Sequence, residues 1–281
     1  MGANTVLVEG LHDIPGTRVP PADLAAGVNM LFEENAEVVT LEDLSSFSGR
    51  RTPQQAARAL RERGWLFPLP VKGAWGVATG FSAPHMGAFV VLRARLSVSP
   101  GTEACVGGRS AAEVRGWLRR PTSAAIGFPA NERVPWCLAA YAVCRWSPRV
   151  PMDVLHGLPV WKPETLLAYM GTRPGRFPWT DIAEWLPEAC SDVDPELVAD
   201  ELIGRPAAAW ARTAYLLHRG GQHDTAAALR ARGPRLDGGP FYFGRAVAGL
   251  DDAMPWLPVW SSEYCVVDYA LERNWSYDWD T

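Results

Sequence analysis

Residues 40–78 read TLEDLSSFSGRRTPQQAARALRERGWLFPLPVKGAWGVA, and the pattern within them decides the fold of this part of the chain. Thr40, followed three residues later by Asp43, is typical of a capping box, in which the threonine oxygen accepts a hydrogen bond from an orphan amide at a helix start. We expect a short helix to begin here, because Ser48 and Gly49 follow within two turns and indicate its end.

A second helix start follows directly. Thr52 stands at the N-cap, Pro53 takes the first helical position, where no backbone amide is needed, and Gln55 takes the third. We expect this helix to run to about residue 63 and to stop at Gly64, because glycine tolerates the backbone of a helix C-terminus.

The two faces of this second helix differ in polarity. One face is apolar and carries Ala56, Ala57 and Leu60. The opposite face is polar and carries Arg51, Gln54, Gln55, Arg58 and Arg61. Side chains three and four residues apart stack on successive turns, so we expect one continuous buried face and one continuous exposed face.

After the second helix the pattern changes from helical to extended. Residues 65–70 indicate one strand, 71–73 a turn and 74–78 a returning strand. An earlier segment, 22–35, has apolar residues at helical spacing. A helix, a short helix, a tight turn, a polar-faced helix and a two-stranded hairpin, in this order, predict a winged helix-turn-helix.

Such a motif would bind DNA through its second helix. Arginine reads guanine and glutamine reads adenine by paired hydrogen bonds to base edges. Residues at the preceding turn and at the tip of the wing would instead contact phosphates. The candidate DNA-binding residues are therefore Arg50, Arg51, Thr52, Gln54, Gln55, Arg58, Arg61 and Lys72. The alternative is a solvated helix face, since helices rich in arginine and glutamine are common on protein surfaces.

The rest of the chain predicts a second, larger domain. Residues 80–87 are typical of a linker, so we expect a DNA-binding domain at 1–80 and a C-terminal domain at 88–281. Segment 88–98 is ambiguous between strand and helix. We expect strands at 123–128, 136–146 and 241–243, and helices at 110–119, 163–170, 179–189, 195–204, 206–219 and 222–232. The predicted fold class is α+β, with the second domain mixed α/β and rich in helices.

Charge is distributed unevenly along the chain, although its net value is only −4. Residues 1–48 hold eight acidic residues and one arginine, and residues 150–281 hold 19 acidic and 11 basic residues. Residues 49–149, in contrast, hold 15 basic and four acidic residues. This pattern favours a basic surface that attracts a negatively charged partner, unless folding intermixes the blocks.

Composition excludes several classes of protein. Hydrophobic residues make up 48% and charged residues 21% of the 281 residues, which argues against wholesale disorder. The sequence has neither a run of 18 apolar residues nor a secretory signal pattern, so we expect a soluble, cytoplasmic protein. The five cysteines lack CxxC spacing and predict buried, reduced thiols.

The sequence shows no pattern for catalysis, a cofactor or a metal. Phosphate-binding, dinucleotide-binding and nucleophile-elbow motifs are absent, and we therefore expect a protein that is not an enzyme and needs no cofactor. The histidines are scattered: His218 and His223 are five residues apart with no third ligand at a recognisable spacing, so no metal site is expected. We expect Trp185 and Trp210 in the core, whereas Trp256, Trp260, Trp275 and Trp279 pack onto their own domain or anchor an interface.

Segment 45–79 resembles the N-terminal winged helix of the AbiEi-type antitoxins of abortive-infection toxin–antitoxin systems. The resemblance spans residues 20–245 and continues through the segments 145–149 (RWSPR), 157–160 (GLPV), 163–167 (PETLL) and 205–217 (RPAAAWARTAYLL). It implies a protein that represses its own operon through the winged helix and counteracts a nucleotidyltransferase-like toxin through its C-terminal domain. Residues 107–113, GGRSAAE, depart from the family pattern and weaken the transfer of C-terminal roles.

The C-terminal domain carries a further candidate surface. Residues 93–149 hold nine arginines and three acidic residues, and from them we single out Arg115, Arg119 and Arg120 as a basic partner surface. This surface would extend the DNA footprint, or meet an acidic partner or a nucleic-acid substrate of the toxin. Two other functions stay open: a module that sequesters the toxin directly, and an enzyme that modifies the toxin.

Overall fold

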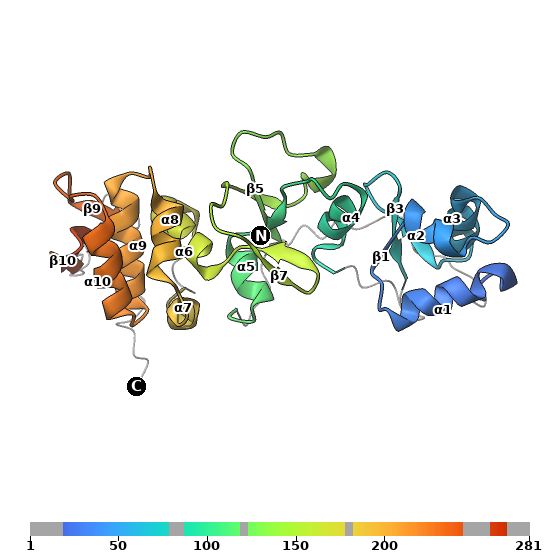
Figure 1. Cartoon of the computed structure of the whole chain (residues 1–281), viewed down its shortest axis with the longest axis horizontal. Coiled ribbons are helices and arrows are strands. Elements are labelled where there is room, and N and C mark those ends of the chain that lie inside the picture. The colour runs from blue at the N-terminus through green and yellow to red at the C-terminus, as the bar shows by residue number, and fades with distance from the viewer. Residues whose placement is uncertain (1–18, 79–86, 119–122, 178–181, 244–258, 269–281) are drawn as a thin grey trace, which may run out of the picture. The chain divides into compact units, whose positions relative to one another are not determined.

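A computed structural model describes residues 19–78, 87–118, 123–177, 182–243 and 259–268 (Figure 1). Helices and three β-sheets alternate along these residues, so the predicted α+β class is confirmed. The chain forms two compact units. The first comprises Met1–Ala104 and Asn131–Val143, and the second comprises Cys105–Ala130 and Cys144–Thr281.

The first unit combines helices with a three-stranded antiparallel sheet. In chain order its elements are η1 (Ala22–Leu24), α1 (Ala25–Glu33), β1 (Val38–Thr40), α2 (Leu41–Phe47), α3 (Pro53–Glu62), β2 (Leu66–Pro68), β3 (Ala74–Val77), α4 (Val90–Val98) and η2 (Trp136–Leu138). The sheet order is β1-β3-β2, with Val39 opposite Trp75 and Phe67 opposite Gly76.

Both predicted helix starts are capping boxes in the structure. The Thr52 hydroxyl accepts from the Gln55 amide at 3.2 Å, and the Gln55 side chain accepts from the Thr52 amide at 2.9 Å. Thr40 and Asp43 form the equivalent pair at the start of α2. The apolar face of α3 is buried as predicted and packs with residues of α1, α2, β1, β2 and β3.

The ambiguous segment 88–98 forms the helix α4, which packs against β1 and β3. Arg93 of α4 bonds Glu37 at 3.1 Å. The segment Asn131–Val143 completes this unit, because η2 packs on α4 and the Leu92 amide donates to the Tyr141 hydroxyl at 3.3 Å.

The predicted strand 136–146 is wrong over its first half. Residues Trp136–Leu138 form the 3-10 turn η2, and only Ala142–Arg145 is a strand. Pro135 starts the turn, whose buried Cys137 and Leu138 satisfy the apolar pattern without a strand. The predicted linker 80–87 lies, up to residue 86, outside the described residues, and the separability of 1–80 from 88–281 stays a prediction.

A five-stranded sheet in the order β6-β5-β4-β8-β7 belongs to the second unit, except for the first two residues of β6, Ala142 and Val143, which are assigned to the first unit. Its strands are β4 (Cys105–Val106), β5 (Ala125–Phe128), β6 (Ala142–Arg145), β7 (Asp153–Leu155) and β8 (Leu158–Val160). Strands β4 and β8 are parallel, whereas β7 and β8 form a tight antiparallel hairpin. His156 and Gly157 both have positive φ, 51° and 70°, as a two-residue hairpin turn requires.

Helices make up most of the rest of this unit, and all five helices predicted beyond residue 163 are present. They are α6 (Pro163–Thr172), α7 (Ile182–Cys190), α8 (Pro195–Leu202), α9 (Ala207–Arg219) and α10 (His223–Arg232), preceded by α5 (Arg109–Val114), with η3 (Pro174–Arg176) after α6. Helix α6 is buried over most of its length and packs on α8 and α9. Trp185 and Trp210 are buried, as predicted.

A third sheet, β10-β11-β9, contains Phe241–Phe243 as β9, Val259–Ser261 as β10 and Val266–Asp268 as β11. Strands β9 and β11 pack on α9. The Tyr215 hydroxyl of α9 donates to the buried carboxylate of Asp268 at 2.8 Å. The predictions for Trp256, Trp275 and Trp279 fall outside the described residues, and the side chain of Trp260 is not described.

One buried carboxylate joins three parts of the second unit. Glu201 of α8 is fully buried, and its Oε1 accepts from the Thr165 hydroxyl at 2.7 Å and from the amides of Arg149 and Val150 at 3.0 and 3.2 Å. Its Oε2 accepts from the Trp146 indole at 3.1 Å. Glu201 therefore connects α8 to α6 and to the RWSPR segment.

Candidate functional site

The polar face of α3 is the first candidate site. Gln54, Gln55, Arg58 and Arg61 are exposed along it, whereas Arg51 is only partly exposed. The exposed face and the buried Ala56, Ala57 and Leu60 are on opposite sides of one helix. The sequence-predicted side chains of this helix therefore lie together on one surface of the first unit.

Three of these side chains have partners within the protein. Arg51 donates to Asp23 at 2.6 Å, and this guanidinium lowers the pKa of the Asp23 carboxyl. Arg58 bonds Glu62 at 2.8 Å, but the two side chains are 82% and 61% exposed. An exposed pair of this kind contributes little stability, so Arg58 can exchange Glu62 for another partner at small cost. Gln55 is held in its capping box.

The remaining candidate residues of the first unit lie at two turns. Arg50 is exposed after Gly49, whose φ is +60°, and Lys72 is exposed before Gly73, whose φ is +86°. The Leu41 amide donates to the Gly73 carbonyl at 3.1 Å and so fixes the β2–β3 turn to the start of α2. Thr52 acts as the N-cap of α3.

Of the three arginines predicted to form a basic partner surface, Arg115 lies within the described residues. Arg115 is only 13% exposed: its guanidinium forms an ion pair with Asp153 and donates to the Trp161 carbonyl at 2.8 Å. This arrangement leaves Arg115 little charge to offer a partner. Arg119 and Arg120 lie outside the described residues.

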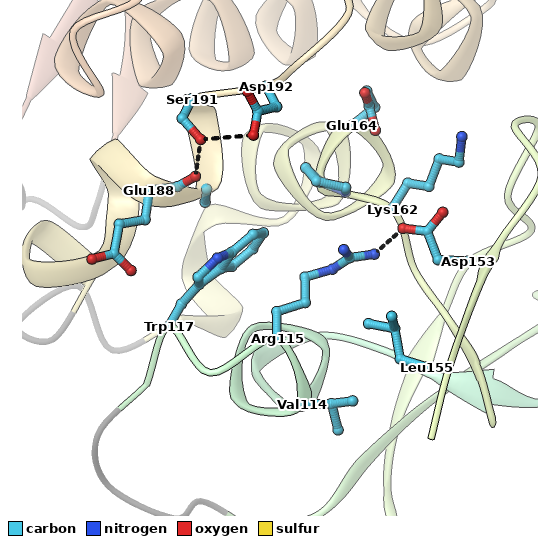
Figure 2. A pocket seen from close by; sticks show the side chains of 12 residues that line it. Val114, Arg115, Trp117, Asp153, Leu155, Lys162, Glu164, Glu188, Ser191 and Asp192 are labelled. Atoms are coloured by element: carbon cyan, nitrogen blue, oxygen red, sulfur yellow. Dashed lines mark hydrogen bonds and ion pairs between the residues drawn. The ribbon is translucent and has the colours of Figure 1, made fainter. Parts of the chain in front are cut away.

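The Arg115–Asp153 pair lies inside a pocket of 540 Å³ in the second unit, which the sequence did not predict (Figure 2). The end of α5, the strand β7, the start of α6 and the end of α7 supply its walls. Its charged lining residues are Arg115, Asp153, Lys162, Glu164, Glu188 and Asp192. They are up to 77 positions apart in the chain, and no local motif connects them.

Glu164 is the most deeply buried charged residue in the pocket lining, with 4% of its surface exposed. Its Oε1 accepts from the Asp194 amide at 3.2 Å, whereas its Oε2 has no hydrogen-bond partner. Beside it, the Ser191 hydroxyl contacts Asp192 Oδ2 at 3.4 Å and donates to the Glu188 carbonyl at 2.9 Å (Figure 2).

The histidines and the buried cysteines are weaker candidates for a functional site. In the described part of the chain, no group of three or more His, Cys, Asp and Glu side chains is placed to hold a metal ion. His218 and His223 contact each other through their Nδ1 atoms at 3.0 Å. Burial raises the pKa of the Cys105 and Cys190 thiols to about 12, which makes them poor nucleophiles.

The fold and the two candidate sites thus define a two-unit α+β protein. One site is an exposed helix that bears arginine and glutamine, and the other is a polar pocket in the second unit. The family model of the AbiEi antitoxin C-terminal domain matches residues 103–219. The crystal structure of the RV2827C protein from Mycobacterium tuberculosis is 31% identical, with a TM-score of 0.72 over 92% of this chain and 95% of that chain. Among curated proteins, none matches this chain.

The chain belongs to the AbiEi antitoxin family. Membership implies a toxin as partner and favours a regulator without enzymatic activity. Within the described residues, no helix has the length and apolarity that crossing a membrane requires.

Proposed function

We propose that this antitoxin is also a transcriptional autorepressor whose first unit is a winged helix-turn-helix that binds operator DNA. The order α1, β1, α2, α3, β2, β3 supports the proposal, with α3 as recognition helix and the β2–β3 hairpin as wing. The observation that carries it is the exposed row of Gln54, Arg58 and Arg61 on a helix whose other face is buried.

The contacts of these side chains suggest different roles for them in DNA binding. Gln54, Arg58 and Arg61 would read base edges, while Arg50 and Lys72 would contact phosphates at the two flanking turns. Arg51, Thr52 and Gln55 are bonded within the protein and would chiefly hold the start of α3 in position.

Gel shifts with the promoter of the antitoxin's own operon test this proposal. Arg58→Ala should weaken specific binding by about 1–3 kcal/mol and relax base preference at one position. Lys72→Ala or Arg50→Ala should weaken all sequences alike and lower the salt slope by about one unit each. Arg173→Ala, an exposed arginine of the second unit, is the matched control. Unchanged operator affinity in Arg58→Ala would refute the assignment of α3.

We further propose that the toxin is nucleotidyltransferase-like and that the C-terminal domain counteracts it. The match to the antitoxin domain supports this placement, because it begins only at residue 103. A full-length chain with both Arg58→Ala and Arg61→Ala, expressed from an unrelated promoter, should lose operator binding yet still relieve toxicity. Residues 1–80 alone should not relieve it. Rescue by 1–80 would make repression itself the protective activity.

Two measurements separate the ways in which the toxin is neutralised. Co-purification of the two proteins at micromolar concentration would favour direct sequestration, whereas a mass shift on the toxin would favour covalent modification. Arg119 and Arg120 stay part of the proposal as a basic surface, whereas Arg115 does not, because Asp153 pairs with its charge. Charge reversal at Arg119 and Arg120 should reduce relief of toxicity more than reversal at Arg230 and Arg232.

A further inference from the structure

The pocket of the second unit has a polar interior that the fold itself does not use. Arg115 and Asp153 form an ion pair within it. Glu164 keeps one carboxylate oxygen without a donor, although its side chain is buried. Buried polar groups normally have partners, so an orphan acceptor in the wall of a pocket indicates a missing donor.

The charges of the lining residues indicate whether the missing donor is positively charged or neutral. Because Arg115 and Asp153 neutralise each other, two carboxylates (Glu164 and Asp192) remain against one ammonium group, that of Lys162. The carboxylate of Glu188 is turned away from both carboxylates (Figure 2). In Figure 2 the ammonium of Lys162 is turned away from Asp192. The field in the pocket therefore favours a cation.

One wall of the pocket is flat and held in place. Trp117 stacks on Trp185 with ring centroids 6.3 Å apart and an interplanar angle of 11°, and the Arg115 guanidinium lies 5.5 Å from the Trp117 ring centroid. Both neighbours restrain the indole that forms this wall. A rigid apolar wall beside carboxylates suits a planar cation better than a compact, strongly hydrated ammonium.

We propose that this pocket binds an arginine side chain of the toxin, with the guanidinium placed between Glu164 and Asp192. An arginine presents several donors in a fixed fork and forms strong hydrogen bonds to carboxylates. The proposal rests on the proposed toxin-neutralising role of the C-terminal domain. In its support, all lining residues lie between 114 and 192, inside the region that matches the antitoxin domain.

The pocket is first tested without the toxin. N-acetyl-arginine methylamide is titrated into the full chain while the indole signal of Trp117, assigned with Trp117→Phe, is followed by NMR. We expect a saturable shift, and binding about tenfold weaker or more for the neutral citrulline counterpart. Glu164→Gln and Asp192→Asn should each weaken arginine binding about tenfold. Asp192 is exposed, so its variant should fold normally.

Glu184→Gln is the matched control, because Glu184 is exposed on α7 and does not line the pocket. The proposal is overturned if the arginine probe leaves Trp117 unchanged, if citrulline binds equally well, or if the control weakens binding as much as the pocket variants do.

The second arm measures capture of the toxin encoded beside this antitoxin. Glu164→Gln and Asp192→Asn should retain less toxin than Glu184→Gln. If both pocket variants capture toxin like the wild type, the toxin is not the occupant and the proposal fails, while direct sequestration stands. If the wild type captures no toxin, direct sequestration fails and the toxin is not the occupant, so the proposal fails with it. The titration then shows only whether the pocket can bind a guanidinium group.

Discussion

Glu201→Ala should destabilise the second unit strongly. The substitution removes the acceptor of four hydrogen bonds and leaves the donors of Trp146, Arg149, Val150 and Thr165 without it. Each buried donor without a partner costs about 1–3 kcal/mol, and water entering the vacated space would recover part of this. Hydrogen bonds to a charged group contribute about 1.5–3 kcal/mol each, and the desolvation cost of the carboxylate disappears with it, so we expect a net loss of about 3–5 kcal/mol.

Glu201→Gln separates charge from shape. Glutamine keeps one oxygen for three of the donors, but its amide would face the Trp146 indole donor, so we expect a smaller loss of about 1–3 kcal/mol. Urea denaturation of the full chain, followed by circular dichroism, measures both variants against Asp200→Asn, an exposed neighbour expected within about 0.5 kcal/mol of wild type. A loss below about 1 kcal/mol in Glu201→Ala would refute the role assigned to this carboxylate.

Three further outcomes are expected. Thr52→Ala should lower stability by about 1 kcal/mol in urea denaturation, because it removes the N-cap of α3; an unchanged midpoint would contradict this. Burial and His223 lower the pKa of His218, so the unfolded chain takes up the proton first and stability should fall as pH drops below about 6.5. That loss should be smaller in His218→Gln; an equal loss assigns it to other groups. Cys105 and Cys190 should resist alkylation in the native protein near pH 8, as read by mass spectrometry, because burial raises the pKa of each thiol to about 12. Rapid labelling of either thiol would show that the structure around that cysteine opens in the native protein.

Most structural features that the sequence predicted correctly depend on residues close together in the chain. The two capping boxes and the buried face of α3 depend on residues at most four positions apart, so Thr52, Gln55 and Leu60 predicted their own environment. The hairpin β7–β8 was missed because its turn is His156–Gly157, a weaker signal than Asn-Gly for two residues of positive φ.

Long-range packing determined what the sequence could not predict. Nothing distinguishes Glu201 from its neighbour Asp200 in the sequence, yet the first is fully buried and the second is exposed. The pocket likewise depends on α5, β7, α6 and α7 meeting, so Glu164 looks from the sequence like an ordinary acidic residue in the first turn of a helix.

The polypeptide passes between the two units three times, because the first unit is completed by Asn131–Val143 after the second has begun. A single recombination breakpoint within the gene would therefore transfer the first unit without η2 and Tyr141, the residues that pack on α4. Shuffling of the first unit between antitoxins should consequently be rare unless 131–143 travels with it. We expect the two units to have been inherited as one gene segment.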